Sequence, residues 1–184
     1  HVACTYKASD EVVKLLLEYD TEKKSIHEKT DDGNIPLHNA CTNDVSVEVI
    51  NLLLEYDFEK KSIYEKGNYG RIPLHFACSN HSPLEVIQLL LKYDVEKKSI
   101  FEGDNSGCYP LNCMHRKDTC NVPVEVVRLL LQYYTIVNMK HFYDIPFYQL
   151  KVDNHIKSLS ERCIRINIAS GKVYKLYRKV DNFT

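Results

Sequence analysis

The chain has 184 residues, 44% of them hydrophobic, and a formal net charge of −1 at pH 7. This balance excludes a disordered, highly charged tail and predicts one ordered array. No run of 18 apolar residues occurs, so the sequence predicts no membrane-spanning helix. The chain starts at His1, without a methionine and inside an expected helix. We therefore expect a piece of a longer protein, from which a targeting signal is not readable.

A repeat with a period of 37 residues runs through the sequence. Four features recur at this spacing, each three times: a glycine, a Pro-Leu pair, an Ala-Cys pair and a Lys-Lys-Ser-Ile run. The glycines are Gly33, Gly70 and Gly107, the prolines are Pro36, Pro73 and Pro110, and the Ala-Cys pairs begin at Ala3, Ala40 and Ala77. A fixed period of this length is typical of a solenoid, in which each unit buries its apolar face only against its neighbours. Such an array favours binding on a long surface over catalysis in an enclosed pocket.

Each unit is expected to contain two helices. The proline suits the first position of the first helix, where φ is already fixed and no amide donor is needed. The glycine three residues upstream suits a turn with positive φ. The second helix, Glu-Val-Ile-x-Leu-Leu-Leu at 48–54 and 85–91, is apolar nearly all round, which predicts a helix sandwiched between neighbours. The run Ser82-Pro83-Leu84-Glu85 predicts a capping box at the start of one such helix, with the proline just inside it.

The units read Gly-Asn-Ile-Pro-Leu-His-Asn-Ala-Cys from Gly33 and Gly-Arg-Ile-Pro-Leu-His-Phe-Ala-Cys from Gly70. This pattern resembles the ankyrin repeat, and the resemblance covers roughly residues 1–165. It implies an all-α solenoid of paired antiparallel helices with finger loops and a degenerate C-terminal cap. The array is expected over 1–164, as a partial repeat at 1–32, repeats at 33–69, 70–106 and 107–143, and a degenerate repeat at 144–164. Residues 165–184 are expected to form a basic tail, either a hairpin or a helix.

Two departures from the ankyrin pattern are visible. Its usual threonine is replaced by Ile35, Ile72 and Tyr109, so the turn should depend more on packing. The unit is also longer than the familiar repeat, and we place about three of the extra residues in the loop after the second helix. This loop is the Asp-x-Glu-Lys-Lys-Ser-Ile segment, for example from Asp57. It is expected to be an extended finger with one helical turn capped by the aspartate.

Three of the seven cysteines, Cys4, Cys41 and Cys78, occupy one equivalent helical position. Equivalent positions in successive ankyrin-like units lie about 10 Å apart, whereas a disulfide bridges Cα atoms up to about 7 Å apart. We therefore interpret these residues as small buried hydrophobic side chains. This interpretation implies a reducing compartment, the cytoplasm or the nucleus.

Four further residues, Cys108, Cys113, His115 and Cys120, are of the types that bind zinc. Their spacing differs from that of zinc knuckles and ribbons, whose leading cysteines are usually two residues apart. We expect no metal site and no other cofactor, and we favour oxidation-sensitive surface thiols. No phosphate-binding loop or nucleophile motif occurs. By the ankyrin resemblance, the histidines of the Pro-Leu-His motif bond loop backbone groups, so no catalytic residue is expected.

Charge is unevenly distributed along the chain. Residues 151–184 contain eight Lys or Arg against three acidic residues. The Lys-Lys pairs of the repeats, such as Lys60 and Lys61, are framed by acids and leave no uncompensated positive field for phosphates. They predict an ion-paired edge exposed to solvent, and nucleic acid is not the expected partner.

Differences between the units indicate candidate binding residues. Positions that are the same in every unit serve the common fold, whereas outward-facing positions that change are free to serve a partner. The changing positions are the loop tips, the residue after each glycine and the residue after each Pro-Leu-His motif. The candidate residues are Asn34, Asn39, Asn68, Tyr69, Arg71, Phe76, Asn105, Cys108 and Cys113. In the ankyrin arrangement they line the concave groove and the fingers, and Tyr, Phe and Arg are types suited to binding hot spots.

The expected function is non-enzymatic protein–protein recognition, with a partner protein bound in the groove and on the finger loops. No small-molecule substrate is expected. Two alternatives stay open. In the first, the array is the targeting or regulatory arm of a larger enzyme of the kinase or ubiquitin-ligase type. In the second, the basic tail binds a polyanion such as nucleic acid or anionic lipid.

Overall fold

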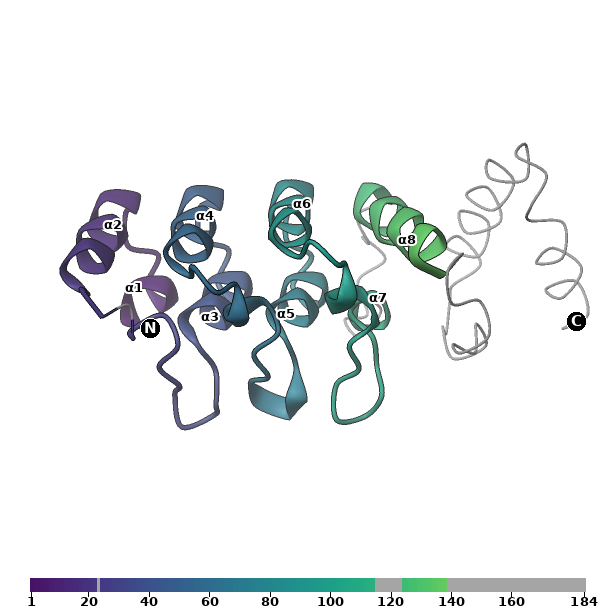
Figure 1. Ribbon diagram of the computed structural model, residues 1–184, viewed down its shortest axis with the longest axis horizontal. Coiled ribbons are helices and arrows are strands. Elements are labelled where there is room, and N and C mark those ends of the chain that lie inside the picture. The colour runs from purple at the N-terminus through teal and green to yellow at the C-terminus, as the bar shows by residue number, and fades with distance from the viewer. Residues whose placement is uncertain (23, 115–123, 139–184) are drawn as a thin grey trace, which may run out of the picture. The chain divides into compact units, whose positions relative to one another are not determined.

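The structure is a computed structural model that describes residues 1–22, 24–114 and 124–138. The chain divides into two units, His1–Pro123 and Val124–Thr184. In the first unit, pairs of helices follow one another in two rows, with loops projecting below the row of shorter helices (Figure 1). Within the described part of the chain, no helix is long and apolar enough to cross a membrane.

Short helices form an inner row and longer helices an outer row. The inner row contains α1 (Val2–Thr5), α3 (Pro36–Thr42), α5 (Pro73–Ser79) and α7 (Pro110–Cys113), and the outer row contains α2 (Asp10–Tyr19), α4 (Val47–Tyr56) and α6 (Leu84–Tyr93). Each helix contacts the next helix of its own row, and α3 and α5 also contact their outer-row partners α4 and α6. The described residues contain helices and no strand, which confirms the all-α solenoid.

Each inner helix after α1 begins at its proline, as the sequence predicted. The preceding glycines, Gly33, Gly70 and Gly107, have φ of 78°, 70° and 73°, a region in which glycine pays no steric cost. Ile35 and Ile72, which replace the usual threonine, are both 0% exposed. Packing of these side chains therefore stabilises the turn, by about 1.5–3 kcal/mol for each fully buried isoleucine.

Stacking of successive helix pairs buries the apolar core. Leu53 in α4 and Leu90 in α6 are 4% and 1% exposed. Helix α4 contacts both α2 and α6, which confirms that this outer helix is sandwiched. Cys4, Cys41 and Cys78 are buried and form no disulfide. Burial raises the pKa of each of these thiols, which makes the reactive thiolate harder to form. They pack as small hydrophobic side chains, as predicted.

The capping box predicted at Ser82 is wrong. Helix α6 begins one residue later than expected, and Pro83 is its N-cap residue, with φ −52° and ψ 153°. The hydroxyl of Ser82 instead donates to the carbonyl oxygen of Cys41, 3.4 Å away in the preceding repeat. A serine does cap α4, because Oγ of Ser46 accepts the N–H of Val49 at 3.2 Å. Ser82 therefore stabilises the stack of repeats rather than the start of its own helix.

The residues that lengthen the repeat form a compact turn, so the expected extended finger is wrong. They fold into single turns of 3-10 helix, η1 (Lys61–Ile63) and η3 (Lys98–Phe101), which contact the next inner helices, α5 and α7. Ile63 is 2% exposed, so burial of this side chain holds η1 against the core. The predicted aspartate cap is present, because Oδ2 of Asp57 accepts the N–H of Ser62 at 2.8 Å and also the Ser62 hydroxyl.

In the second unit the structure describes α8 (Val124–Asn138), which contains the expected second helix of the repeat at 107–143. The predicted degenerate repeat at 144–164 and the basic tail at 165–184 lie outside the described residues.

Candidate protein-binding surface

Three finger loops, at residues 30–34, 67–71 and 104–108, connect consecutive repeats (Figure 1). In each loop the N–H of the first residue donates to the carbonyl oxygen of the last residue at 2.9 Å. The N–H of the loop glycine donates back to the carbonyl oxygen of the first residue, at 2.7, 3.0 and 2.8 Å. The three loops therefore share one hydrogen-bonded frame, on which different tip residues can be carried.

Histidines of the inner helices α3 and α5 tie the chain at the second and third finger loops to the repeat before it. Nδ1 of His38 accepts the N–H of Ile35 at 3.0 Å, and Nε2 lies 3.0 Å from the carbonyl oxygen of Glu65, to which it donates. His75 makes the equivalent contacts, 3.3 Å from the N–H of Ile72 and 3.0 Å from the carbonyl oxygen of Cys108. Burial lowers the pKa of His38 to about 4, so the ring is neutral at pH 7. These histidines are structural, as the ankyrin resemblance implied.

The first and second finger loops meet through the side chain of Asn34. Its Oδ1 accepts the N–H of Asn68 at 2.9 Å. The same oxygen lies 2.3 Å from where a Cβ at Gly67 would be, so a glycine leaves room for it. In the other two loops this position holds Thr30 and Asp104, whose side-chain oxygens accept N–H groups of their own loop. The second loop takes its acceptor from the preceding repeat instead.

Tyr69 lies at the tip of the second loop and is 69% exposed. Its backbone is left-handed, with φ 58° and ψ 23°, a conformation that costs a non-glycine residue about 1–2 kcal/mol. The equivalent residues of the other loops, Asp32 and Ser106, do not have positive φ. The carbonyl oxygen of Tyr69 accepts the N–H of Asn105 at 2.9 Å, which holds the tip in place. An exposed aromatic residue on strained backbone is a reason to suspect a functional site.

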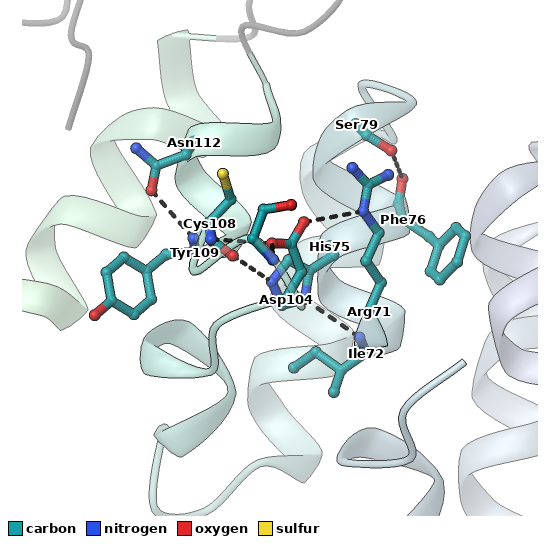
Figure 2. A network of polar contacts seen from close by, with 10 residues as sticks. Arg71, Ile72, His75, Phe76, Ser79, Asp104, Cys108, Tyr109 and Asn112 are labelled. Atoms are coloured by element: carbon teal, nitrogen blue, oxygen red, sulfur yellow. Dashed lines mark hydrogen bonds and ion pairs between the residues drawn. The ribbon is translucent and has the colours of Figure 1, made fainter. Parts of the chain in front are cut away.

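Arg71 was expected to face a partner, but its side chain forms a buried ion pair with Asp104 (Figure 2). Nε lies 3.3 Å from Oδ2, and the two side chains are 13% and 1% exposed. The other carboxylate oxygen accepts the N–H groups of Ser106 and Cys108. Burial alone would raise the pKa of Asp104, but these hydrogen bonds and the guanidinium together hold it below its usual value. Arg71 therefore joins two repeats and offers little surface to a partner.

Phe76 and Asn39 occupy equivalent positions on inner helices and are both half-buried. The ring of Phe76 packs edge-on against His38, with centroids 5.1 Å apart and planes at 65°. The side-chain amide of Asn39 lies 3.3 Å from Nδ1 of His1. Each side chain contacts the repeat before its own and keeps part of its surface exposed.

The expectation that Cys113 faces outward is wrong, because it is 1% exposed. Burial raises the pKa of its thiol to about 11. Tyr69 and Asn105 are the exposed candidates, and the half-buried ones are Asn34, Asn39, Asn68, Arg71, Phe76 and Cys108. A position can vary between repeats because it faces solvent, as Tyr69 does, or because it meets a different residue of the neighbouring repeat, as Arg71 does.

The first lysine of two Lys-Lys pairs has a structural role that was not predicted. Lys60 and Lys97 are left-handed, with φ of 55° and 56°, and their ammonium groups donate to carbonyl oxygens in the last turn of the outer helix, those of Leu54 and Leu91. A cation there is favoured by the helix dipole. The second lysine of each pair is exposed and paired with the glutamate two residues before it, which confirms the ion-paired edge. The presence of both lysines at 23–24, 60–61 and 97–98, one pair in each of the first three repeats, was the available signal.

No group of three His, Cys, Asp or Glu side chains among the described residues could hold a metal ion. His115 and Cys120, two of the four residues considered for zinc, lie outside them. The absence of a zinc site therefore stays a prediction.

Helix pairs, finger loops and a stacked core define an array of repeats. The sequence profile of ankyrin repeats, in three copies, matches residues 1–100. The chain therefore belongs to the ankyrin repeat family. Ankyrin repeats are in general protein–protein interaction modules, and domains built from them are typically non-catalytic. A search of curated proteins finds no significant match.

Proposed function

We propose that this protein is a non-enzymatic scaffold that binds a partner protein along the finger loops and the adjoining groove of the inner helices. The observation that carries the proposal is Tyr69, an exposed aromatic side chain on a strained loop tip. Hydrogen bonds to Asn34 and Asn105 hold this loop from both sides. Binding a partner should therefore cost little free energy for ordering the loop. Tyrosine is also among the residue types that dominate binding energy at protein interfaces.

The tips of the neighbouring loops suit the rim of the same surface. Asp31 and Asp32 on the first loop, and Asn105 and Ser106 on the third, are exposed polar residues. A polar rim around an aromatic centre is the usual composition of a protein–protein interface. The partner is therefore proposed to place an apolar pocket over Tyr69 and polar groups over the flanking tips.

Photo-crosslinking tests this proposal. A photoreactive phenylalanine derivative is placed at position 69 and, as a matched control, at position 58, where Phe58 is 76% exposed in the turn after α4. In the cells that make the protein, we expect a defined adduct from position 69 and none from position 58.

The partner protein identified in the adduct is then purified, and its dissociation constant Kd for variants of this chain is measured. Tyr69→Ala is expected to raise Kd about tenfold or more, equivalent to about 1.4 kcal/mol. Phe58→Ala should leave Kd unchanged. Equal crosslinking from both positions, or an unchanged Kd for Tyr69→Ala, would contradict the proposal.

A location in the cytoplasm or nucleus is part of the same proposal and rests on the unpaired cysteines. Of the alternatives, an arm of a larger enzyme is favoured by no observation among the described residues. The basic tail that would bind a polyanion lies outside them.

A further inference from the structure

We call the interface between one repeat and the next a joint. Two consecutive joints each contain a buried aspartate at the equivalent position. Asp57 and Asp94 are each 1% exposed. In both, Oδ2 accepts the N–H and the hydroxyl of the serine five residues later, Ser62 or Ser99. The second oxygen, Oδ1, faces a residue of the preceding repeat, and here the two joints differ.

Between the second and third repeats, the hydroxyl of Tyr64 donates to Oδ1 of Asp94 at 2.5 Å. Between the first and second repeats, the equivalent residue is His27, whose Nε2 lies 3.5 Å from Oδ1 of Asp57. That oxygen accepts no hydrogen bond from the residues that the structure describes. A buried carboxylate oxygen without a donor destabilises the fold.

We propose that His27 and Asp57 form a pH-sensitive contact that strengthens the stacking of the first repeat on the second when His27 takes up a proton. The imidazole side chain is 35% exposed, so protons reach it from solvent. Histidine is the side chain that ordinarily changes charge near pH 6.5, and an imidazolium gives a carboxylate a stronger, charge-assisted hydrogen bond. A tyrosine in the same place stays an uncharged donor throughout this range, since burial and the bond to Asp94 raise the pKa of Tyr64.

Several charged groups lie on the elements next to this contact. Lys60 and Lys61 lie at η1 beside Asp57, and Lys29 pairs with Glu65 across the same two repeats at 2.8 Å. Lysines and glutamates as classes change charge outside pH 5.5–7.5. These groups are the same in every variant at position 27, so a difference between those variants reports on His27.

Two other histidines need a control. His1 contacts Asn39 across the same joint. The pKa of His38 is lowered to about 4 by burial, so the unfolded chain takes up that proton first, and acid destabilises the fold between pH 6.5 and 4. This effect is opposite in sign to the one proposed for His27. Variants are therefore compared with one another at the same pH.

Hydrogen exchange of the α2 amides in the whole chain tests the proposal, with wild type, His27→Phe and His27→Tyr measured at pH 7.5 and 5.5. The ratio of wild-type to His27→Phe protection should be severalfold larger at pH 5.5 than at pH 7.5, because only the histidine gains a positive charge beside Asp57. The ratio of His27→Tyr to His27→Phe protection should stay constant. A wild-type ratio that is equal at the two pH values would overturn the proposal.

Substitutions at the equivalent residue of the next joint, Tyr64, give a second test if His27→Phe detaches the first repeat altogether. Tyr64→His and Tyr64→Phe are compared in the same way, with the α4 amides as the readout. The Tyr64→His ratio should rise on acidification, at a joint that His1 does not contact. A flat ratio there, with α4 still protected, would equally overturn the proposal.

Discussion

Arg71 and Asp104 come from consecutive repeats and face each other in a site that excludes most water. Removal of the guanidinium in Arg71→Ala leaves a buried carboxylate without its cation, so we expect a loss of about 3 kcal/mol in the free energy of unfolding. Urea unfolding at pH 7 measures it. Lys66→Ala is the matched control, because Lys66 pairs with Glu102 in the same joint but both side chains are exposed, 54% and 38%. That loss should stay below about 1 kcal/mol, and equal losses would contradict the assignment.

At the scale of the finger loop, Gly67 is required by the side chain of the preceding repeat. A Cβ there would lie 2.3 Å from Oδ1 of Asn34, so Gly67→Ala should displace that oxygen from the N–H of Asn68. We expect a cost of about 1–3 kcal/mol in unfolding free energy. Gly103→Ala is the control, since the nearest atom to its Cβ is 3.5 Å away and the change should be small. In an Asn34→Ala background, Gly67→Ala should cost less; an unchanged cost would show that the crowding has another source.

Local features of the elements could be predicted from sequence, and contacts between repeats could not. The prolines and glycines determine where the inner helices begin through their own backbone preferences, so those positions were predicted correctly. The ion pair of Arg71, by contrast, depends on a partner 33 residues away, and the sequence alone shows only a variable position. Burial of Cys113 was missed for the same reason. The exposure of Tyr69 was anticipated, but its left-handed backbone depends on the neighbouring loops and was not.

For the whole array, stability is expected to depend on stacking more than on any single repeat. Leu90→Ala opens a cavity between consecutive helix pairs and should cost about 2–5 kcal/mol. Because each repeat is stabilised by its neighbours, hydrogen exchange should accelerate in α4 as well as in α6. Gln88→Ala, an exposed change on the same helix, is the control and should leave both helices protected. Acceleration confined to α6, or none, would contradict a cooperative stack.

The joints between finger loops also determine which repeat can follow which. Asn34 and Arg71 are equivalent positions, and so are the residues they meet, Gly67 and Asp104. If the two joints were crossed, a guanidinium would lie against a glycine that carries no opposite charge, and an asparagine would lie against a carboxylate that has lost its cation. The repeats have nearly the same helices, yet they are not interchangeable parts. The matched residues at each joint determine the order of the repeats along the chain. A duplicated or shuffled repeat would fit only if the repeat next to it carried the matching residue.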